Sequence, residues 1–77
     1  MEKLEELDVV IALKDLENGV KKGDMGTIME VGYDGYLVAF QYFENDLPKD
    51  RVIDVLFEDV KPTEWTLKRI EERRKTN

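Results

Sequence analysis

The side chains of this sequence that could do chemistry are carboxylates, lysines and tyrosines. Its 77 residues include no cysteine, histidine or serine. The common nucleophiles, the usual proton carrier at neutral pH and the imidazole and thiolate ligands of transition metals are therefore missing. The acidic residues also lack the spacing of an EF-hand loop. We expect a protein that is not an enzyme and that binds neither a metal nor a cofactor.

Charge is distributed unevenly along the chain, whose net charge is -6. Residues 1–63 carry 7 basic and 15 acidic residues, a net of -8, whereas residues 64–77 carry 5 basic and 3 acidic residues, a net of +2. An acidic body repels nucleic acid, because phosphate contacts require cationic side chains. No apolar run is long enough to span a membrane, and the charged start MEKLEELD lacks the apolar core of a signal peptide. We expect a cytoplasmic protein without membrane contacts.

Aromatic and acidic side chains are the candidates for recognising a protein partner. Exposed aromatic residues are common anchors of protein interfaces, and carboxylates can steer the approach of a basic partner. The candidate partner-binding residues are Tyr33, Phe43, Asp46, Asp50, Asp54, Glu58 and Asp59. Glu44 belongs to the same acidic stretch. A solvated surface that keeps the protein soluble is the simpler interpretation of these carboxylates.

Basic side chains suggest an alternative, a nucleic-acid site. The candidates are Lys21, Lys22, Arg73, Arg74 and Lys75. Acidic residues at 71 and 72 dilute the C-terminal group, and basic residues near the end of a helix also suit its dipole. Contact with nucleic acid is therefore the less favoured interpretation.

Glycines cluster in the stretch GDMGTIMEVGYDG, which could hold a phosphate or shape turns. No Gly-Lys-Ser/Thr ending follows them, and the next residues predict a strand rather than a helix. Gly23 and Gly35 suit turns that need a positive φ. Gly26 lies one residue inside a predicted strand, where a bend, a bulge or a close backbone approach would require it. We interpret all three as structural residues.

Short strands separated by turns must position these residues. β-rich runs predict strands at residues 7–15, 25–31, 36–43 and 51–57, with a brief last strand around Val60. Asp34-Gly35 is a hairpin signal, and Pro48 is expected to stop any strand through the turn at residues 44–50. Because alternate residues of a strand share a face, one face of the third strand is predicted to carry Tyr36, Val38, Phe40 and Tyr42.

Residues 63–75 predict a helix capped by Thr63. We expect Trp65 to pack this helix against the sheet, and Tyr36, Phe40 and Phe57 to lie in the core. The predicted fold is all-β, a small SH3-like barrel of four to five strands with a C-terminal α-helix. The barrel spans residues 1–62, and the helix and tail span residues 63–77.

The segments LDVVIALKDLENGVKKGDMGTIMEV, GYLVAF and VLFEDVKP resemble domain-of-unknown-function family 4926, a family of short bacterial proteins. The resemblance covers about Leu7 to Pro62. Its most specific positions are Lys22, Gly23, Asp24, Gly26, Thr27, Glu30 and Val31. The family looks like an SH3-like barrel, and its G-D-x-G-x-I stretch is similar to KOW-type domains of ribosomal proteins and transcription factors. The C-terminal TEWTLKRIEERRKTN departs from the minimal domain, and the resemblance implies a fold without an activity.

These observations favour a non-catalytic module that binds another protein. A concrete version is an antitoxin-like or immunity-like protein whose acidic surface masks a basic enzyme. One alternative is a KOW-like accessory of RNA or of the transcription and translation machinery, and another is a purely structural domain. A homo-oligomer is a further alternative, because the basic helix of one chain could contact either its own acidic barrel or that of a second chain.

Overall fold

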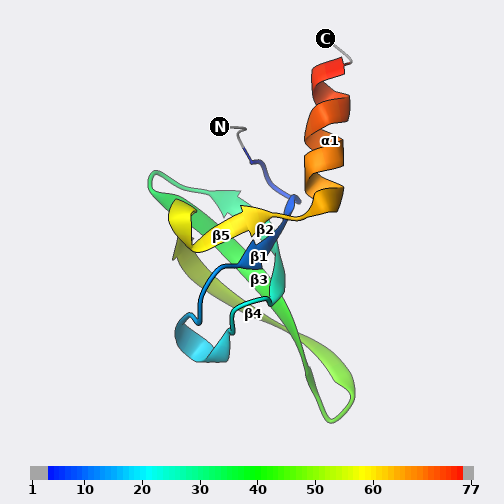
Figure 1. The fold of residues 1–77 in the computed structure, drawn as a ribbon. Coiled ribbons are helices and arrows are strands. Elements are labelled where there is room, and N and C mark those ends of the chain that lie inside the picture. The colour runs from blue at the N-terminus through cyan, green and yellow to red at the C-terminus, as the bar shows by residue number, and fades with distance from the viewer. Residues whose placement is uncertain (1–3, 76–77) are drawn as a thin grey trace.

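The computed structural model describes residues 4–75, so positions 1–3 of the predicted barrel and positions 76–77 of the predicted tail lie outside the described residues. The strands are β1 (Val9–Ala12), β2 (Met25–Val31), β3 (Gly35–Glu44), β4 (Leu47–Leu56) and β5 (Val60–Pro62). Two short 3₁₀ turns, η1 (Glu17–Gly19) and η2 (Phe57–Asp59), and one helix, α1 (Glu64–Lys75), complete the fold. All five strands form a single antiparallel sheet of order β4-β3-β2-β1-β5 (Figure 1). The sheet is not closed, since β4 and β5 are its two edges within the described residues.

The core lies on one face of this sheet, and the alternation predicted for the third strand is confirmed. Val38 and Phe40 are buried, whereas Gln41 and Phe43 are exposed. Tyr36 is partly buried and packs against the core. Burial of these side chains from water is the main favourable contribution to folding. The core consists of Leu4, Val10, Ala12, Val20, Ile28, Val38, Phe40, Ile53, Val55, Val60 and Ile70.

The strand boundaries agree with the sequence in part. The strand at residues 25–31 and the brief strand at Val60 are confirmed, and β3 extends one residue beyond its prediction at each end. β1 is shorter than the predicted 7–15, because Leu7 adopts a left-handed backbone conformation (φ 73°) and the chain leaves the sheet after Ala12. A left-handed residue cannot belong to a regular strand.

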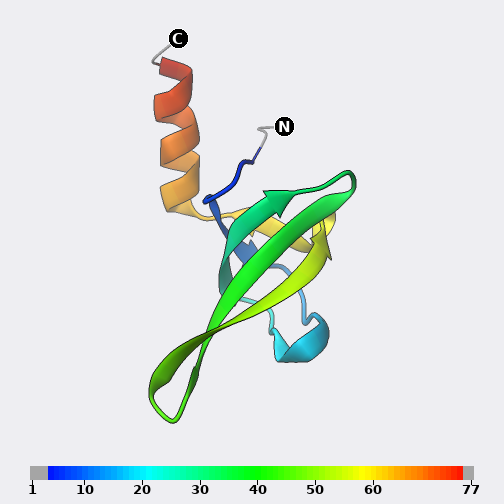
Figure 2. The same cartoon turned by 180° about the vertical axis from the view of Figure 1, so that it is seen from behind.

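Pro48 does not end the strand, and this prediction is wrong. The turn is the residue pair Asn45-Asp46, whose φ values of 51° and 64° are those of a tight two-residue hairpin. β4 starts at Leu47, and Pro48 pairs with Phe43. Proline is tolerated on an edge strand where its position would point an N–H away from the neighbouring strand. The ends of β3 and β4 therefore continue as an arm that projects from the body (Figure 2).

The three glycines have different structural roles. Gly23 has the predicted positive φ, at 94°. Gly35 does not have a positive φ, so that reason is wrong; a Cβ there would collide with the carbonyl oxygen of Val55 on the paired strand. A Cβ on Gly26 would lie 2.6 Å from Val38 Cγ1 and 2.8 Å from Phe40 Cδ1. Gly26 therefore allows β2 to lie directly against core side chains of β3.

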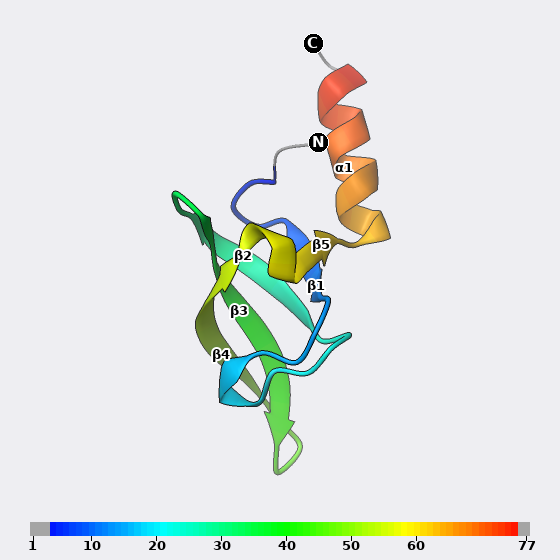
Figure 3. The same ribbon diagram turned by 60° about the vertical axis from the view of Figure 1, so that its left-hand side comes forward.

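Helix α1 packs on β1 through Thr66 and Ile70, which lie one turn apart on the same helix face. The hydroxyl of Thr66 donates to the carbonyl oxygen of Val9 at 2.8 Å and accepts the N–H of Val9 at 2.9 Å. The Thr63 hydroxyl accepts the N–H of Thr66 at 3.2 Å, so the predicted N-cap is confirmed. The helix then extends away from the sheet (Figure 3). Within residues 4–75, no helix has the length and apolar character needed to cross a membrane.

The aromatic residues are less buried than the sequence predicted. Phe40 is buried as expected, but Phe57 is 42% exposed and contacts only the edge of Tyr36 among aromatic rings of the described chain. Trp65 is 53% exposed and does not pack the helix on the sheet, because it lies on a different helix face from Ile70. Its ring lies 4.8 Å from the guanidinium carbon of Arg69 instead.

Candidate functional site

An acidic groove of about 530 Å³ lies between the segment that follows β1 and the ends of β2, β3 and β4. Its apolar lining is Leu16, Tyr36, Leu37, Val55 and Leu56. Its carboxylates are Asp15, Glu17, Glu30, Asp34, Asp54 and Asp59, and Lys14 is its one basic residue within positions 4–75. Six carboxylates against one lysine give the groove a strongly negative potential, which a concave shape intensifies.

Two groove carboxylates are positioned by the pairing of three strands. Leu37 of β3 pairs with Glu30 of β2 on one side and with Asp54 of β4 on the other. Glu30 reaches this register because β2 has an irregularity between Ile28 and Glu30, which shifts the pairing by one residue. Such bulges re-aim side chains. Leu37 is therefore flanked by the carboxylates of Glu30 and Asp54 on the same face of the sheet.

Asp34 and Asp59 also line the groove. Asp34 lies in the β2–β3 turn, where Gly32 donates to the carbonyl oxygen of Gly35 at 2.8 Å. Asp59 is 7% exposed, and its Oδ2 accepts the N–H of Leu56 at 3.1 Å. Its Oδ1 lies 3.1 Å from Lys14 Nζ but makes no hydrogen bond of good geometry with the described residues, so the contact is an ion pair only. Asp59 therefore forms part of the groove wall.

Tyr36 contributes an uncharged phenol to the groove. Burial raises the pKa of its hydroxyl above the usual 10.0, and the negative charge of Asp8 raises this pKa further. Its ring meets Phe57 edge-on, with centroids 4.8 Å apart. The folded state therefore favours the neutral phenol over the phenolate.

The partner-binding residues predicted from sequence separate into two groups. Asp54 and Asp59 line the groove, and the fully exposed Tyr33 lies in the turn that borders it. Phe43, which is 69% exposed, lies instead on the projecting β3–β4 arm (Figure 1). Asp46 and Asp50 lie on the same arm, and Glu58 is exposed on η2.

Four groove carboxylates are not among the binding residues predicted from the sequence, namely Asp15, Glu17, Glu30 and Asp34. They precede the acidic residues that were predicted to bind a partner, which begin at Glu44. Only the folded sheet brings them beside Asp54. The hairpin signal at Asp34-Gly35 was a clue in the sequence, because it pairs the strands that carry Glu30 and Leu37.

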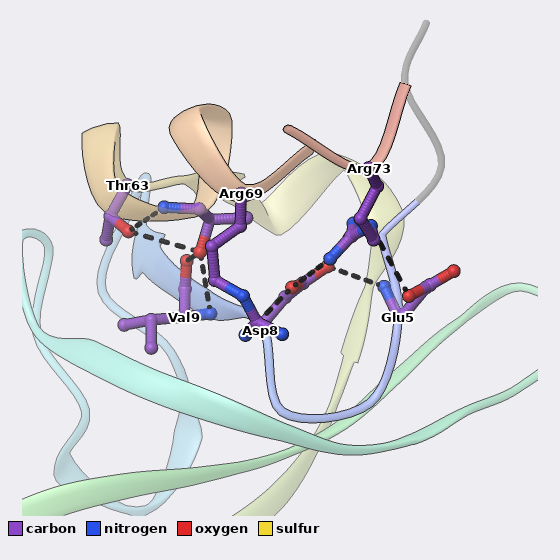
Figure 4. A network of polar contacts seen from close by, with 7 residues as sticks. Glu5, Asp8, Val9, Thr63, Arg69 and Arg73 are labelled. Atoms are coloured by element: carbon purple, nitrogen blue, oxygen red, sulfur yellow. Dashed lines mark hydrogen bonds and ion pairs between the residues drawn. The ribbon is translucent and has the colours of Figure 1, made fainter. Parts of the chain in front are cut away.

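The basic residues predicted for nucleic acid are not brought into one surface. Lys21 and Lys22 lie in the turn before β2, whereas residues 73–75 lie at the far end of α1 (Figure 1). Arg73 binds the fully buried Asp8, with Nη1–Oδ1 at 3.3 Å and Nη2–Oδ2 at 3.4 Å (Figure 4). Lys75 Nζ lies 3.5 Å from Glu71 Oε1.

Asp8, which is not among the residues predicted from the sequence, makes further contacts. It accepts the N–H of Glu5 at 2.8 Å, and Arg69 Nη1 lies 3.8 Å from its Oδ1 (Figure 4). Arg73 Nε also lies 3.6 Å from Glu5 Oε2. The two arginines therefore hold α1 on the segment before β1.

Within residues 4–75, no group of three or more acidic side chains has an arrangement that could hold a metal ion. No family model, curated protein or solved structure matches this chain, so its resemblance to family 4926 stays a prediction.

Proposed function

We propose that this protein is a binding module whose acidic groove receives a basic segment of another protein. The observation that carries the proposal is the lining of the groove, which combines six carboxylates with apolar residues such as Leu16 and Leu37. Carboxylates favour cationic side chains, and apolar lining residues favour the burial of hydrocarbon. The combination suits a peptide segment that carries both kinds of side chain.

The concrete form of this function is masking of a basic enzyme, as an antitoxin-like or immunity-like protein would do. Negative potential over a groove accelerates the encounter with a positive surface and makes the association rate dependent on salt. Tyr33 at the groove border and Phe43 on the arm are exposed aromatic side chains that could anchor such an interface.

We further propose that the sheet is an SH3-like barrel that is incompletely closed. Three features support this assignment. β1 lies between β2 and β5 in the sheet, the 3₁₀ turn η2 directly precedes β5, and Gly26 pairs with both Val10 and Phe40. In small barrels one strand bends to serve two halves of the sheet, and glycine permits that bend.

The test is a pull-down with tagged protein from a lysate of the source cell, with one half treated with nuclease. The groove variant carries Asp34→Asn and Asp54→Asn. The control variant carries Glu71→Gln and Glu72→Gln on α1, which changes net charge by the same amount. We expect a basic protein that survives nuclease treatment, is lost with the groove variant and is retained with the control.

Two results would contradict the proposal. Equal loss of the partner from both variants would mean that net charge alone drives binding. Recovery of RNA, with its proteins lost on nuclease treatment, would favour the KOW-like alternative and would direct attention to Lys21 and Lys22, which are exposed.

A further inference from the structure

Among the described residues, strand β4 has a neighbouring strand on one side only, which is β3. The two-residue turn makes Glu44 and Leu47 the closing pair of the β3–β4 hairpin. Hydrogen-bonded pairs of an antiparallel ladder recur at every second residue, so the backbones of Lys49, Arg51, Ile53 and Val55 point to β3. The backbones of Pro48, Asp50, Val52, Asp54 and Leu56 point to the open side.

Both ends of this open side are closed to a new strand. Pro48 has no N–H. The N–H of Leu56 already donates to Asp59 Oδ2 at 3.1 Å. The N–H groups of Asp50, Val52 and Asp54 lie between these two ends and point away from β3. Apart from the pairing of β3 with β4, they make no hydrogen bond to any of residues 4–75. A window of three outward-facing residues therefore offers unused backbone donors and acceptors.

The side chains along this window alternate in character. Asp50 and Asp54 are exposed carboxylates, and Val52 between them is 51% exposed. A strand added at an edge places its side chains directly opposite those of the existing strand. The favourable partner of this window is thus a strand with basic, apolar and basic residues at alternating positions.

We propose that the open side of β4 from Asp50 to Asp54 takes up an extended segment of the protein partner, with basic, apolar and basic side chains at positions i, i+2 and i+4. This inference rests on the proposed function, because it gives the bound segment its conformation. Asp54 also lines the acidic groove, so a segment paired with β4 leads directly into it.

A second copy of the chain is a poor occupant of this edge. Two β4 strands that pair antiparallel through all three window residues place Val52 opposite Val52. Asp50 then lies opposite Asp54 of the other copy at both ends. Like charges directly opposite each other destabilise a sheet, whereas a basic strand turns the same two positions into attractive pairs.

The probe for this proposal is the capped peptide Thr-Arg-Thr-Val-Thr-Arg-Thr, titrated into the full chain labelled with nitrogen-15. Amide hydrogen exchange is expected to slow by about 10-fold or more at Asp50, Val52 and Asp54, because their N–H groups become paired. Arg51 and Ile53 serve as internal controls, since their N–H groups already point to β3. A peptide with glutamate in place of arginine is expected not to bind.

A second peptide separates strand pairing from charge. It keeps every side chain but is N-methylated at alternate residues, so that it cannot donate to β4. We expect its affinity to fall by about 10-fold or more, the equivalent of one to two net hydrogen bonds. Equal affinity of the two peptides, or protection away from the window, would overturn the proposal.

Protein variants provide a matched comparison at Val52. Val52→Pro removes the central outward N–H without removing a ladder bond, whereas Val52→Thr retains it. We expect about a 10-fold loss for the first variant and less than about a 3-fold change for the second. If Val52→Pro fails to fold, the peptide pair decides the question.

The outcomes also separate this inference from the proposed function. If both peptides bind equally and Asp34→Asn with Asp54→Asn weakens both, the groove function stands and strand addition is wrong. If no arginine-containing peptide binds and no basic protein is captured from the lysate, both proposals fail.

Discussion

The guanidinium of Arg73 donates to both carboxylate oxygens of Asp8, at 3.3 and 3.4 Å. Asp8 lies just before β1 and Arg73 lies in the last turn of α1, so this pair joins the two ends of the described chain. Asp8 is fully buried, whereas Arg73 retains partial access to solvent. A buried carboxylate requires its charge partners, because an unpaired charge away from water is costly.

Asp8→Asn is expected to destabilise the protein by about 2–4 kcal/mol, because it leaves Arg69 and Arg73 beside a neutral amide. Urea unfolding followed by circular dichroism measures the change. The control is Glu5→Gln, which removes the exposed partner of Arg73 and is expected to cost less than about 0.5 kcal/mol. Equal effects of the two substitutions would contradict a special role for the buried carboxylate.

Ile70 rather than Trp65 is expected to hold α1 on the body. Ile70 is 4% exposed, so Ile70→Ala should cost about 2–4 kcal/mol through lost burial and an unfilled cavity. Trp65→Ala should cost less, about 1 kcal/mol, since about half of the residue is exposed to solvent. Thermal unfolding compares the variants, and quenching by acrylamide reports the accessibility of the native indole. A strongly protected indole would contradict the observed packing.

Gly26→Ala is expected to destabilise the protein by about 1–3 kcal/mol. Its new methyl group would meet the buried side chains of Val38 and Phe40, and neither can move without disturbing the core. Gly32→Ala is the matched control, because the nearest atom to its Cβ would be the carbonyl oxygen of Gly35 at 3.4 Å. Urea midpoints of the two variants test the difference, and similar midpoints would refute the close approach of β2 to β3.

Tyr36 is expected to make stability decrease in alkaline solution. Burial and the charge of Asp8 raise its pKa above 10.0 in the folded state, so the folded protein keeps the phenol proton that the unfolded chain loses. This contribution to stability is fully present below the unfolded pKa and is lost as pH rises towards the folded pKa. The decrease in unfolding free energy between about pH 8 and about pH 11 should therefore be smaller in Tyr36→Phe. An equal decrease in both proteins would show that other groups cause it.

Local patterns predicted the elements well. The strand at 25–31, the alternating faces of β3, the cap at Thr63 and the helix that follows all depend on neighbours in sequence, so the sequence contains their causes. Pro48 was wrongly predicted to stop a strand, because a sheet tolerates proline only on certain strands, and that depends on which strand lies at the edge. Strand order is not a local property.

Contacts between distant residues account for the remaining differences. Trp65 is the largest apolar side chain of the helix, yet the position of Ile70 on the helix surface, together with the Arg73–Asp8 pair, decides which face is buried. Gly35 was predicted to be a turn glycine, but glycine is required there because the backbone of Val55 on the paired strand leaves no space for a Cβ. Neither contact has a signal in the residues beside it.

The sequence by itself determined an acidic chain without cysteine, histidine or serine, with short strands and a capped basic helix, because composition and local spacing set these properties. Only the tertiary structure decided which charged side chains lie close to one another. Strand pairing gathers Glu30 and Asp54 around Leu37, and helix packing buries Asp8 against Arg73. The physical reason is that electrostatic interactions depend on distance in space, which the chain acquires only when the sheet forms.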